Sequence, residues 1–255
     1  MNEPTNNNDN NDSKKQEFSL LSDKAILRHM EIGTVVITPF VRDNLSTSSY
    51  DVTLGPYYYR ETEPESGAGV YNPYSEEMVD RVWGSFKKAE THASWSARSG
   101  IKLDNIADDE LIIWIKPKET ILAHTNEFIG GNKTVTTMMK ARSSMGRNFI
   151  EVCKCAGMGD VGYVSRWTME ITNNSRHYSI PLVVGRRLAQ IVFFNTDGIE
   201  NRPYESKGKY QVSSDVTELQ KTWNPSFMLP KMYKDKEILN RSQTYSPSQY
   251  FFEGN

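Results

Sequence analysis

The chain has 255 residues, of which 24% are charged and 37% hydrophobic, and its formal net charge at pH 7 is −2. This composition permits one large globular domain and gives no sign of a basic, nucleic-acid-binding surface; no apolar run reaches the roughly 18 residues of a membrane helix. The sequence also starts without a charged-then-apolar signal pattern, and its only cysteines are Cys153 and Cys155. We therefore expect a cytoplasmic protein in a reducing compartment, with no membrane and no nucleic-acid polymer as partner.

The beginning of the chain is expected to hold a tail and one short helix. Residues 1–16 are rich in asparagine and lack aromatic side chains, which predicts a disordered tail. Ser22 or Asp23 can cap a helix with apolar residues at helical spacing, and Gly33 is a stop signal.

Strand patterns dominate the chain after this helix. In residues 48–56, apolar side chains alternate with Asp51 and Thr53, which predicts a half-buried strand closed by a Gly-Pro turn. Further strands are expected at residues 35–40, 111–115, 121–124, 133–139, 149–155, 163–172, 180–184 and 188–194. Many short strands with few helices predict a sandwich or a distorted barrel.

Two blocks depart from the strand pattern. Residues 61–110 are polar with weak periodicity, so we interpret them as an insertion with one small helix between Val79 and Lys88. Residues 212–255 are polar with scattered aromatic side chains, and we expect irregular structure that packs on the body or on a neighbouring subunit. The main domain is accordingly placed at residues 17–211.

Two familiar motifs occur in a context that argues against their usual function. The glycines at 157, 159 and 162 match a dinucleotide fingerprint, but that motif needs a following helix, and a strand pattern follows instead. They more plausibly allow tight turns and close approach of the backbone to a ligand. His29 and Glu31 match half of a zinc-deaminase signature, but the chain has no C-x-x-C pair, and its four histidines are scattered. No metal ligands are therefore predicted, and both cysteines are interpreted as small core residues.

The segment from Arg142 to Glu170 carries the candidate chemistry. Residues 142–147 read Arg-Ser-Ser-Met-Gly-Arg, and arginine and serine donors suit a polyphosphate. Strand alternation places Trp167, Met169 and Ile171 on one face and Glu170 between two threonines on the other. Glu170 is either a solvent-facing strand residue or a partly desolvated general base. Asp160 is either an ordinary turn residue or a carboxylate that accepts a hydroxyl or orients water.

These residues resemble motifs of the dCTP deaminases, a family of the dUTPase-like superfamily. Seven boxes occur in the family's order, namely Asp23–Ile26 with Ile37–Phe40, Ser49–Gly55, Arg142–Arg147, Ala156–Tyr163, Met169–Asn173, Gly185–Phe194 and Lys209–Gln211. Residues 61–110 and 212–255 lie outside these boxes, and Gly159 and Val161 replace the family's usual isoleucine and proline.

The resemblance implies a mainly β fold, a distorted β-barrel or jelly roll of the dUTPase-like type with a few short helices, assembled as a homotrimer with active sites between subunits. It implies hydrolysis of dCTP to dUTP and ammonia without zinc, with Mg²⁺ bound through the triphosphate. The dUTP, or dUMP derived from it, would supply thymidylate synthesis.

The resemblance also assigns roles to residues. Glu170 would be the general base, and Ser143 and Arg147 would support the attacking water and the carboxylate. The backbone near Ala156 would bind the exocyclic amine, Asp160 the 3′-hydroxyl, and Tyr163 would stack on the deoxyribose. The implied phosphate or lid contacts are Arg142, Ser144, Gln190, Tyr204, Lys209 and Tyr210.

Two other functions stay open at this point. A dUTP diphosphatase, or a bifunctional enzyme that converts dCTP to dUMP, would share the phosphate boxes, although a pure diphosphatase does not need Glu170. A non-catalytic member of the family that binds a nucleotide or a partner protein is the third possibility. The insertion and the C-terminal extension keep it open, whereas the intact set of Ser143, Arg147 and Glu170 argues against it.

Overall fold

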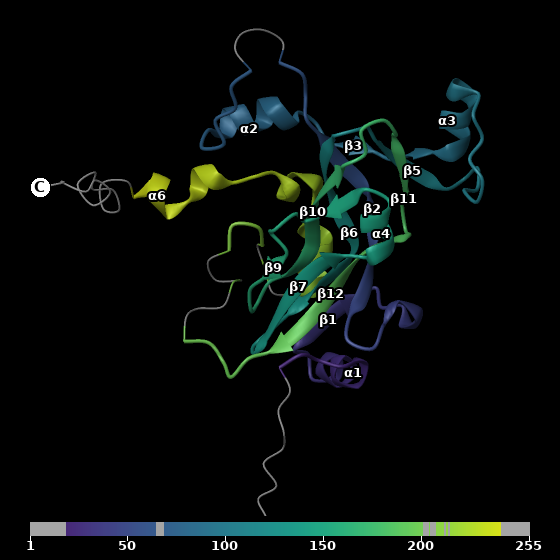
Figure 1. Ribbon diagram of the computed structural model, residues 1–255. Helices are drawn as coiled ribbons and strands as arrows, with labels where there is room; N and C mark the ends of the chain where they lie inside the picture. Colours follow the sequence, from purple (N-terminus) through teal and green to yellow (C-terminus); the bar gives the residue numbers. More distant parts are fainter. Residues whose placement is uncertain are drawn as a thin grey trace, which may run out of the picture.

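A curled antiparallel sheet forms the body of the protein. The computed structural model describes residues 19–64, 69–200, 204, 208–211, 213 and 215–240, so the expected tail at 1–16 lies outside it. The strands of the main sheet run in the order β8-β10-β6-β2-β12-β7-β9, with β1 added to β6 and β3 to β2 (Figure 1). The predicted mainly β fold with few short helices is confirmed.

Twelve strands are described. The main sheet contains β1 (Val35–Thr38), β2 (Tyr50–Arg60), β3 (Lys87–Lys88), β6 (Thr120–Gly131), β7 (Val135–Ala141), β8 (Ile150–Val152), β9 (Met158–Gly159), β10 (Val164–Asn173) and β12 (Arg187–Asn195). A smaller sheet contains β4 (Glu90–Thr91), β5 (Leu111–Ile115) and β11 (Ile180–Val183), in the order β11-β5-β4.

The predicted first helix is confirmed as α1 (Asp23–Glu31). The Ser22 hydroxyl accepts a hydrogen bond from the Ala25 backbone N–H at 3.4 Å, which satisfies one of the free donors of the first turn. Ile26 is fully buried in the main core, and Gly33 follows the helix with a positive φ of 75°. The helix lies against one end of the curled sheet (Figure 1).

The prediction for residues 48–56 was wrong in two respects: the strand continues beyond Pro56, and it is buried on both faces rather than half-buried. β2 continues through Gly55 and Pro56 to Arg60, and Tyr50 to Leu54 are all buried, including Asp51 and Thr53. Gly55 is not a turn residue: a Cβ there would lie 2.0 Å from the His124 ring. Because Gly55 has no side chain, β2 can pass close to the buried imidazole of His124. His124 lies on β6, more than sixty positions further along the chain, so no local pattern could reveal this contact.

The strand predicted at 149–155 is also shorter than expected. β8 covers only Ile150–Val152, because Cys153 and Lys154 turn the chain with φ values of 60° and 40°. Cys153 is buried, as predicted, but Cys155 is exposed and is not a core residue; both are free thiols.

Residues 61–110 contain two helices where one was predicted. The first, α2 (Glu76–Trp83), begins three residues before the expected position because the Ser75 side chain caps it, accepting from Met78 N. It ends at Gly84, whose φ is 58°. The second, α3 (His92–Ser99), was not predicted, since it is short and shows little apolar periodicity. The two helices project on different sides of the sheet (Figure 1).

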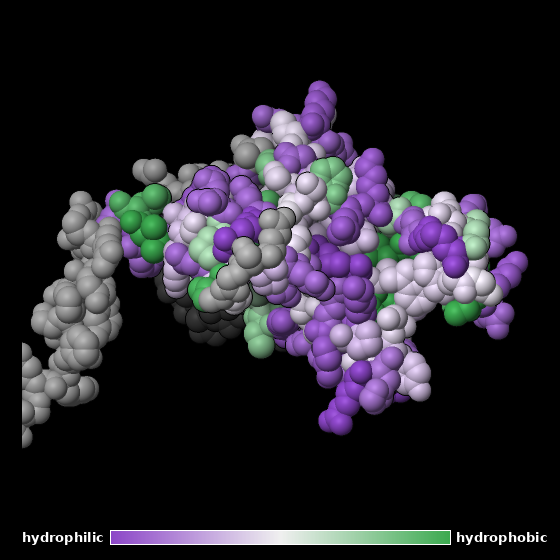
Figure 2. Space-filling view, turned by 90° about the horizontal axis from the view of Figure 1, so that it is seen from above, coloured by the Kyte–Doolittle hydropathy of each residue, from purple (hydrophilic) through white to green (hydrophobic). Residues whose placement is uncertain are grey.

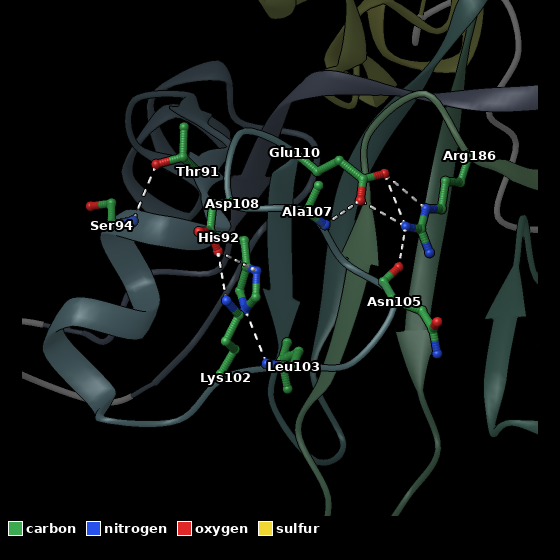
Figure 3. A network of polar contacts seen from close by, with 10 residues as sticks. All are labelled: Thr91, His92, Ser94, Lys102, Leu103, Asn105, Ala107, Asp108, Glu110 and Arg186. Atoms are coloured by element: carbon green, nitrogen blue, oxygen red, sulfur yellow. Dashed lines mark hydrogen bonds and ion pairs between the residues drawn. The ribbon is translucent and has the colours of Figure 1, made fainter.

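The second half of this segment is attached to the turn between β11 and β12 through a carboxylate. Glu110 accepts hydrogen bonds from the Arg186 guanidinium at 2.8 to 3.1 Å, and the Ala107 N–H donates to it at 2.8 Å (Figure 3). The Ala107 hydrogen bond and Arg186 lower the pKa of Glu110. The His92 ring, fully buried nearby, accepts from Leu103 N at 3.1 Å. These contacts hold the loop after α3 in place.

The C-terminal extension is helical rather than irregular where the structure describes it. It contains α5 (Val216–Thr222), α6 (Lys236–Leu239) and two 3₁₀ turns, η3 (Pro225–Met228) and η4 (Met232–Lys234); a third 3₁₀ turn, η1 (Arg42–Asn44), precedes β2. Leu219 and Met228 are buried against β6 and β10. The expectation of irregular structure was wrong because short capped turns are hard to distinguish from loops in sequence. Asp215, for example, caps α5 by accepting from Glu218 N at 2.8 Å.

Trp223 of this extension packs on the buried His124 ring and on Arg166. Its ring lies 4.6 Å from that of His124, and the Arg166 guanidinium lies 5.0 Å from the Trp223 ring centroid. Burial lowers the pKa of His124 to about 4, so its imidazole is neutral at pH 7. A neutral ring can be covered by an indole without the cost of burying a charge.

Trp223→Ala is therefore expected to lower the free energy of local unfolding of residues 215–240 by about 2–3 kcal/mol, as for other truncated aromatic residues. Hydrogen exchange of these amides measures the effect. Tyr178→Ala, which removes a ring that is 71% exposed, is the control. Equal exchange in both variants would show that the extension is held by other contacts.

The view from above shows a mostly hydrophilic surface on which hydrophobic residues form separate small groups (Figure 2). Among the described residues, no helix is long and apolar enough to cross a membrane.

Candidate active site

A cavity of about 570 Å³ lies over strands β6 and β10, beside the segments that join β8 to β9 and β9 to β10. It brings together six of the residues singled out in the sequence, namely Ala156, Asp160, Tyr163, Glu170, Tyr204 and Tyr210. These residues span more than fifty positions, and their convergence depends on the fold.

Glu170 faces this cavity because of strand alternation in β10. Trp167, Met169 and Ile171 are buried in the main core, and Glu170 is half-buried on the opposite face, as predicted. β10 runs antiparallel to β6, and Glu170 pairs with Leu122. The Glu170 Oε2 atom is buried and has no hydrogen-bond partner among the described residues.

Burial raises the pKa of Glu170 above its ordinary value; its own backbone N–H and the charge of Lys154 oppose this effect. A carboxylate whose pKa is raised toward neutrality is a better proton acceptor than an exposed one, provided that it is ionised at the working pH. The solvent-facing interpretation of Glu170 is thus not what the structure shows.

This environment predicts a pH-dependent stability difference between the wild-type chain and Glu170→Gln. A carboxyl group with a raised folded-state pKa binds protons more readily in the folded than in the unfolded chain, so its ionisation destabilises the fold as pH rises. At pH 7.5 the variant is expected to be more stable by about 1 kcal/mol, or roughly 3 °C in Tm. The difference should vanish below the pKa of an unfolded glutamate, where both states are protonated. Thermal melts from pH 3.5 to 8 test this, and a constant difference across that range would contradict it.

Aromatic rings form another wall of the cavity. The Tyr163 ring lies 5.2 Å from that of Trp167 and 5.1 Å from that of Tyr204, both in edge-to-face geometry. Burial raises the pKa of Tyr163, so its hydroxyl stays protonated. Tyr204 N donates to Val161 O at 3.0 Å. The buried Gln211 side chain accepts from Val164 N and donates to Gly162 O.

The glycines of the rejected dinucleotide motif have a structural role here. A Cβ on Gly157 would lie 2.4 Å from Met139 O, and one on Gly159 would lie 2.4 Å from Thr137 Oγ1 and the Trp167 ring. The close approach is therefore to strand β7 and to Trp167, and β9 can pair with β7 because these side chains are absent. Gly162, at φ 93°, supplies the tight turn that was predicted.

The Arg-Ser-Ser-Met-Gly-Arg box does not line this cavity. Ser143–Arg147 form the short helix α4, on which Ser143, Ser144 and Arg147 are exposed. Arg142 precedes the helix and pairs with buried Asp51 at 3.1 Å. Gln190 lies nearby, because its strand β12 pairs with β7, which leads into α4. Within one chain, Glu170 and the residues of this box therefore occupy different places.

Lys209 is likewise outside the lining of the cavity. Its ammonium group forms an ion pair with Asp235 of the C-terminal extension. Lys231 Nζ donates to Lys209 O at 3.1 Å, and Lys231 N donates to the Tyr210 hydroxyl at 3.2 Å. The extension therefore holds the segment that was interpreted as a lid.

Sequence reasoning missed several residues that line the cavity, namely Trp83, Thr120, Leu122, Lys154, Met228 and Pro230. Thr120 and Leu122 could have been found from the pairing of two predicted strands, and Lys154 from its place in the loop before Ala156. No local signal marks Trp83 or Met228, because each reaches the cavity from a segment outside the recognised boxes.

Among the residues that the structure describes, no group of three or more His, Cys, Asp or Glu side chains is arranged to hold a metal ion. Of the described residues that line the cavity, Glu170 and Asp160 alone carry carboxylates.

Comparison with known proteins identifies the family. A family model described as dCTP deaminase-like matches residues 20–196. The chain belongs to this family. A relative from Clostridium botulinum, named "dCTP deaminase, dUMP-forming", is 30% identical over 223 residues, which cover 86% of this chain and 99% of the relative. One of the same name from Methanococcus vannielii is 30% identical over 69% of this chain and 82% of its own length.

A solved structure, the 2′-deoxycytidine 5′-triphosphate deaminase from Agrobacterium tumefaciens, is similar with a TM-score of 0.47 at 18% identity, covering 69% of this chain and 48% of that one. The family model ends at residue 196, before Tyr204, the Lys209–Tyr210 segment and the extension that holds it. In this member of the dCTP deaminase-like family, part of the cavity wall is therefore made by residues beyond the matched region.

Proposed function

We propose that this chain hydrolyses the 4-amino group of dCTP, with Glu170 as the general base. The observation that carries the proposal is the half-buried carboxylate of Glu170 in the wall of a cavity that Asp160, Tyr163 and Ala156 also line. The family membership and the names of the relatives support dCTP as the substrate.

In the proposed reaction, ionised Glu170 takes a proton from water while the water oxygen bonds to C4 of the pyrimidine. The double bond between C4 and N3 opens as the water oxygen adds. The first proton of the water passes to the exocyclic nitrogen, and the second, from the new C4 hydroxyl, passes to N3. The bond from C4 to the exocyclic nitrogen then breaks, and ammonia leaves as the 4-carbonyl forms. The net change is dCTP plus water to dUTP plus ammonia. The raised pKa of Glu170 makes the carboxylate a stronger base for the first step.

Other residues of the cavity would position the substrate. Carbonyl groups of the backbone near Ala156 would accept hydrogen bonds from the amine, Asp160 would bind the 3′-hydroxyl, and Tyr163 would pack on the deoxyribose. Contact of the Tyr163 ring with the 2′-carbon would leave no room for a hydroxyl there, which would favour deoxyribonucleotides. Mg²⁺ would arrive bound to the triphosphate and neutralise part of its charge.

The phosphate contacts would come from a second subunit of a homotrimer. Arg142, Ser143, Ser144 and Arg147 lie on or next to α4, away from the cavity of their own chain, and three of them are exposed. Seated against a neighbour's cavity, α4 would place Ser143 and Arg147 near the attacking water and Arg142 and Ser144 near the phosphates.

A second candidate function extends the first: cleavage of the dUTP intermediate to dUMP and pyrophosphate. The relatives named as dUMP-forming favour it. Asp160, an exposed carboxylate in the same cavity, could orient a second water for attack on phosphorus. Formation of dUTP as the final product, the first expectation from the sequence, is the simpler case.

Product analysis separates these functions. The purified chain is incubated with Mg²⁺ and dCTP or dUTP, and ammonia, dUTP, dUMP and pyrophosphate are followed together. Ammonia with dUTP indicates deamination alone, and ammonia with dUMP and pyrophosphate indicates both steps. Turnover of dUTP alone would indicate a diphosphatase, and the absence of any product would support a non-catalytic nucleotide-binding protein.

A further inference from the structure

The C-terminal extension forms part of the cavity wall and holds another part of it in place. Met228 and Pro230 line the cavity directly, and Lys231 follows them in the chain. Met228 is buried in a cluster with Tyr59 of β2 and Leu122 of β6. The backbone just before Lys231 is therefore attached to the main sheet, by residues of the extension that lie beyond the region matched by the family model.

Lys231 contacts Tyr210, which also lines the cavity, in two ways. Its backbone N–H donates to the Tyr210 hydroxyl at 3.2 Å, and its ammonium group lies 5.4 Å from the centroid of the Tyr210 ring. The same ammonium lies 5.2 Å from the centroid of the Phe227 ring and donates to Lys209 O at 3.1 Å. Both ring distances are within the roughly 6 Å over which a cation is attracted to an aromatic face. The ammonium group thus joins two rings and the backbone beside Tyr210.

Tyr204, another residue of the cavity wall, is packed against the same segment. Gly208 N donates to Tyr204 O at 2.6 Å, and a Cβ on Gly208 would lie 2.1 Å from the Tyr204 ring. The backbone two residues before Tyr210 therefore lies directly on that ring. Tyr204 in turn contacts Tyr163 edge to face. A displacement of Tyr210 would disturb the wall on which the deoxyribose is proposed to pack.

The segment that carries Tyr210 depends on side-chain contacts for its order. Residues 208–211 belong to no helix or strand, so no backbone ladder fixes them. A ligand that has to order such a segment loses binding free energy, whereas a segment that is already ordered avoids this loss. Lys231 provides ordering contacts from within the chain.

We propose that Lys231 is a positioning residue of the active site, which holds Tyr210 in the cavity wall so that the substrate meets a wall that is already formed. The inference rests on the proposed function, in which this cavity binds dCTP. Lys231 does not line the cavity itself, so it acts on substrate binding through Tyr210 and leaves the chemical step to other residues. The extension is then needed for full affinity.

Steady-state kinetics of ammonia release from dCTP test this role. Lys231→Met removes the ammonium group and keeps most of the apolar stem, and it should raise KM about tenfold while kcat changes less than about twofold. Lys231→Arg keeps a cation beside both rings and should bring KM to within about twofold of the wild-type value. In a Tyr210→Ala background, Lys231→Met should have no further effect on KM, since its effect passes through Tyr210.

Lys234→Met is the matched control. The Lys234 ammonium also lies over a ring, 5.6 Å from the centroid of Tyr233, but Tyr233 does not line the cavity. This variant should keep KM within about twofold of the wild-type value. An unchanged KM in folded Lys231→Met, judged by its Tm, would overturn the inference. So would an equal rise in KM when Lys231→Met is added to Tyr210→Ala.

A further variant and a measurement without substrate keep the inference testable. Phe227→Leu removes one of the two rings and leaves Lys231 in place, so it should raise KM about threefold even if Lys231→Met does not fold. Hydrogen exchange of residues 208–211 should be faster in Lys231→Met and Phe227→Leu than in the wild-type chain and Lys234→Met. Equal exchange in all four would overturn the inference. If the wild-type chain releases no ammonia from dCTP, the proposed function fails, and the exchange rates still decide whether Lys231 holds Tyr210.

Discussion

Glu170→Gln is expected to reduce the rate of ammonia release from dCTP by about 10³-fold, within the range measured for the loss of a general base. The amide is nearly isosteric with the carboxylate, so the cavity keeps its shape, but it cannot accept a proton from water. Binding of the nucleotide should change by no more than about threefold, the effect of one altered polar contact. A coupled ammonia assay and calorimetry with dCTP measure the two quantities.

The pH dependence of the wild-type rate gives an independent check of the same role. Burial raises the pKa of Glu170, and the base acts only when ionised, so kcat should fall with decreasing pH at a higher pH than an exposed glutamate would give. Glu151→Gln, which alters an exposed carboxylate on the neighbouring strand β8, should leave both rate and profile unchanged. Turnover retained in Glu170→Gln would remove Glu170 from the role of base.

Mixed oligomers of Arg147→Ala and Glu170→Gln are expected to be active although each variant alone is not. α4 does not line the cavity of its own chain, so Arg147 would serve the site of a neighbour. In randomly mixed rings, about a quarter of the sites pair an intact Arg147 from one subunit with an intact Glu170 from the next. Equal amounts of the two variants are unfolded, refolded together and assayed for ammonia release.

The controls for this experiment use pairs damaged in the same half of the site. Mixtures of Arg147→Ala with Ser143→Ala should stay inactive, because no arrangement restores both residues of α4 at one site. Native mass spectrometry confirms that mixed assemblies form and reports their subunit number. Mixed assemblies without recovered activity would place the action of Arg147 within its own chain and would contradict the shared site.

Local patterns were enough to find the main parts of the fold and the proposed base. Ser22 and Gly33 marked the first helix correctly, and the alternation around Glu170 predicted its face, because capping and strand period act over a few neighbouring residues. The box from Arg142 to Arg147 was recognisable because it also lies within a few neighbouring residues, and its arginine and serine side chains are typical donors to an anion.

The sequence by itself therefore determined the fold class, the family resemblance and Glu170, whereas only the tertiary structure decided what surrounds Glu170. Trp83 and Met228 reach its cavity through packing on Leu122, and no short-range pattern encodes contacts between segments so far apart in the chain. Gly55 looked like a turn residue until the His124 ring was found beside it. Strand register brings these residues together, and register is set by the sum of many long-range contacts rather than by any one stretch of sequence.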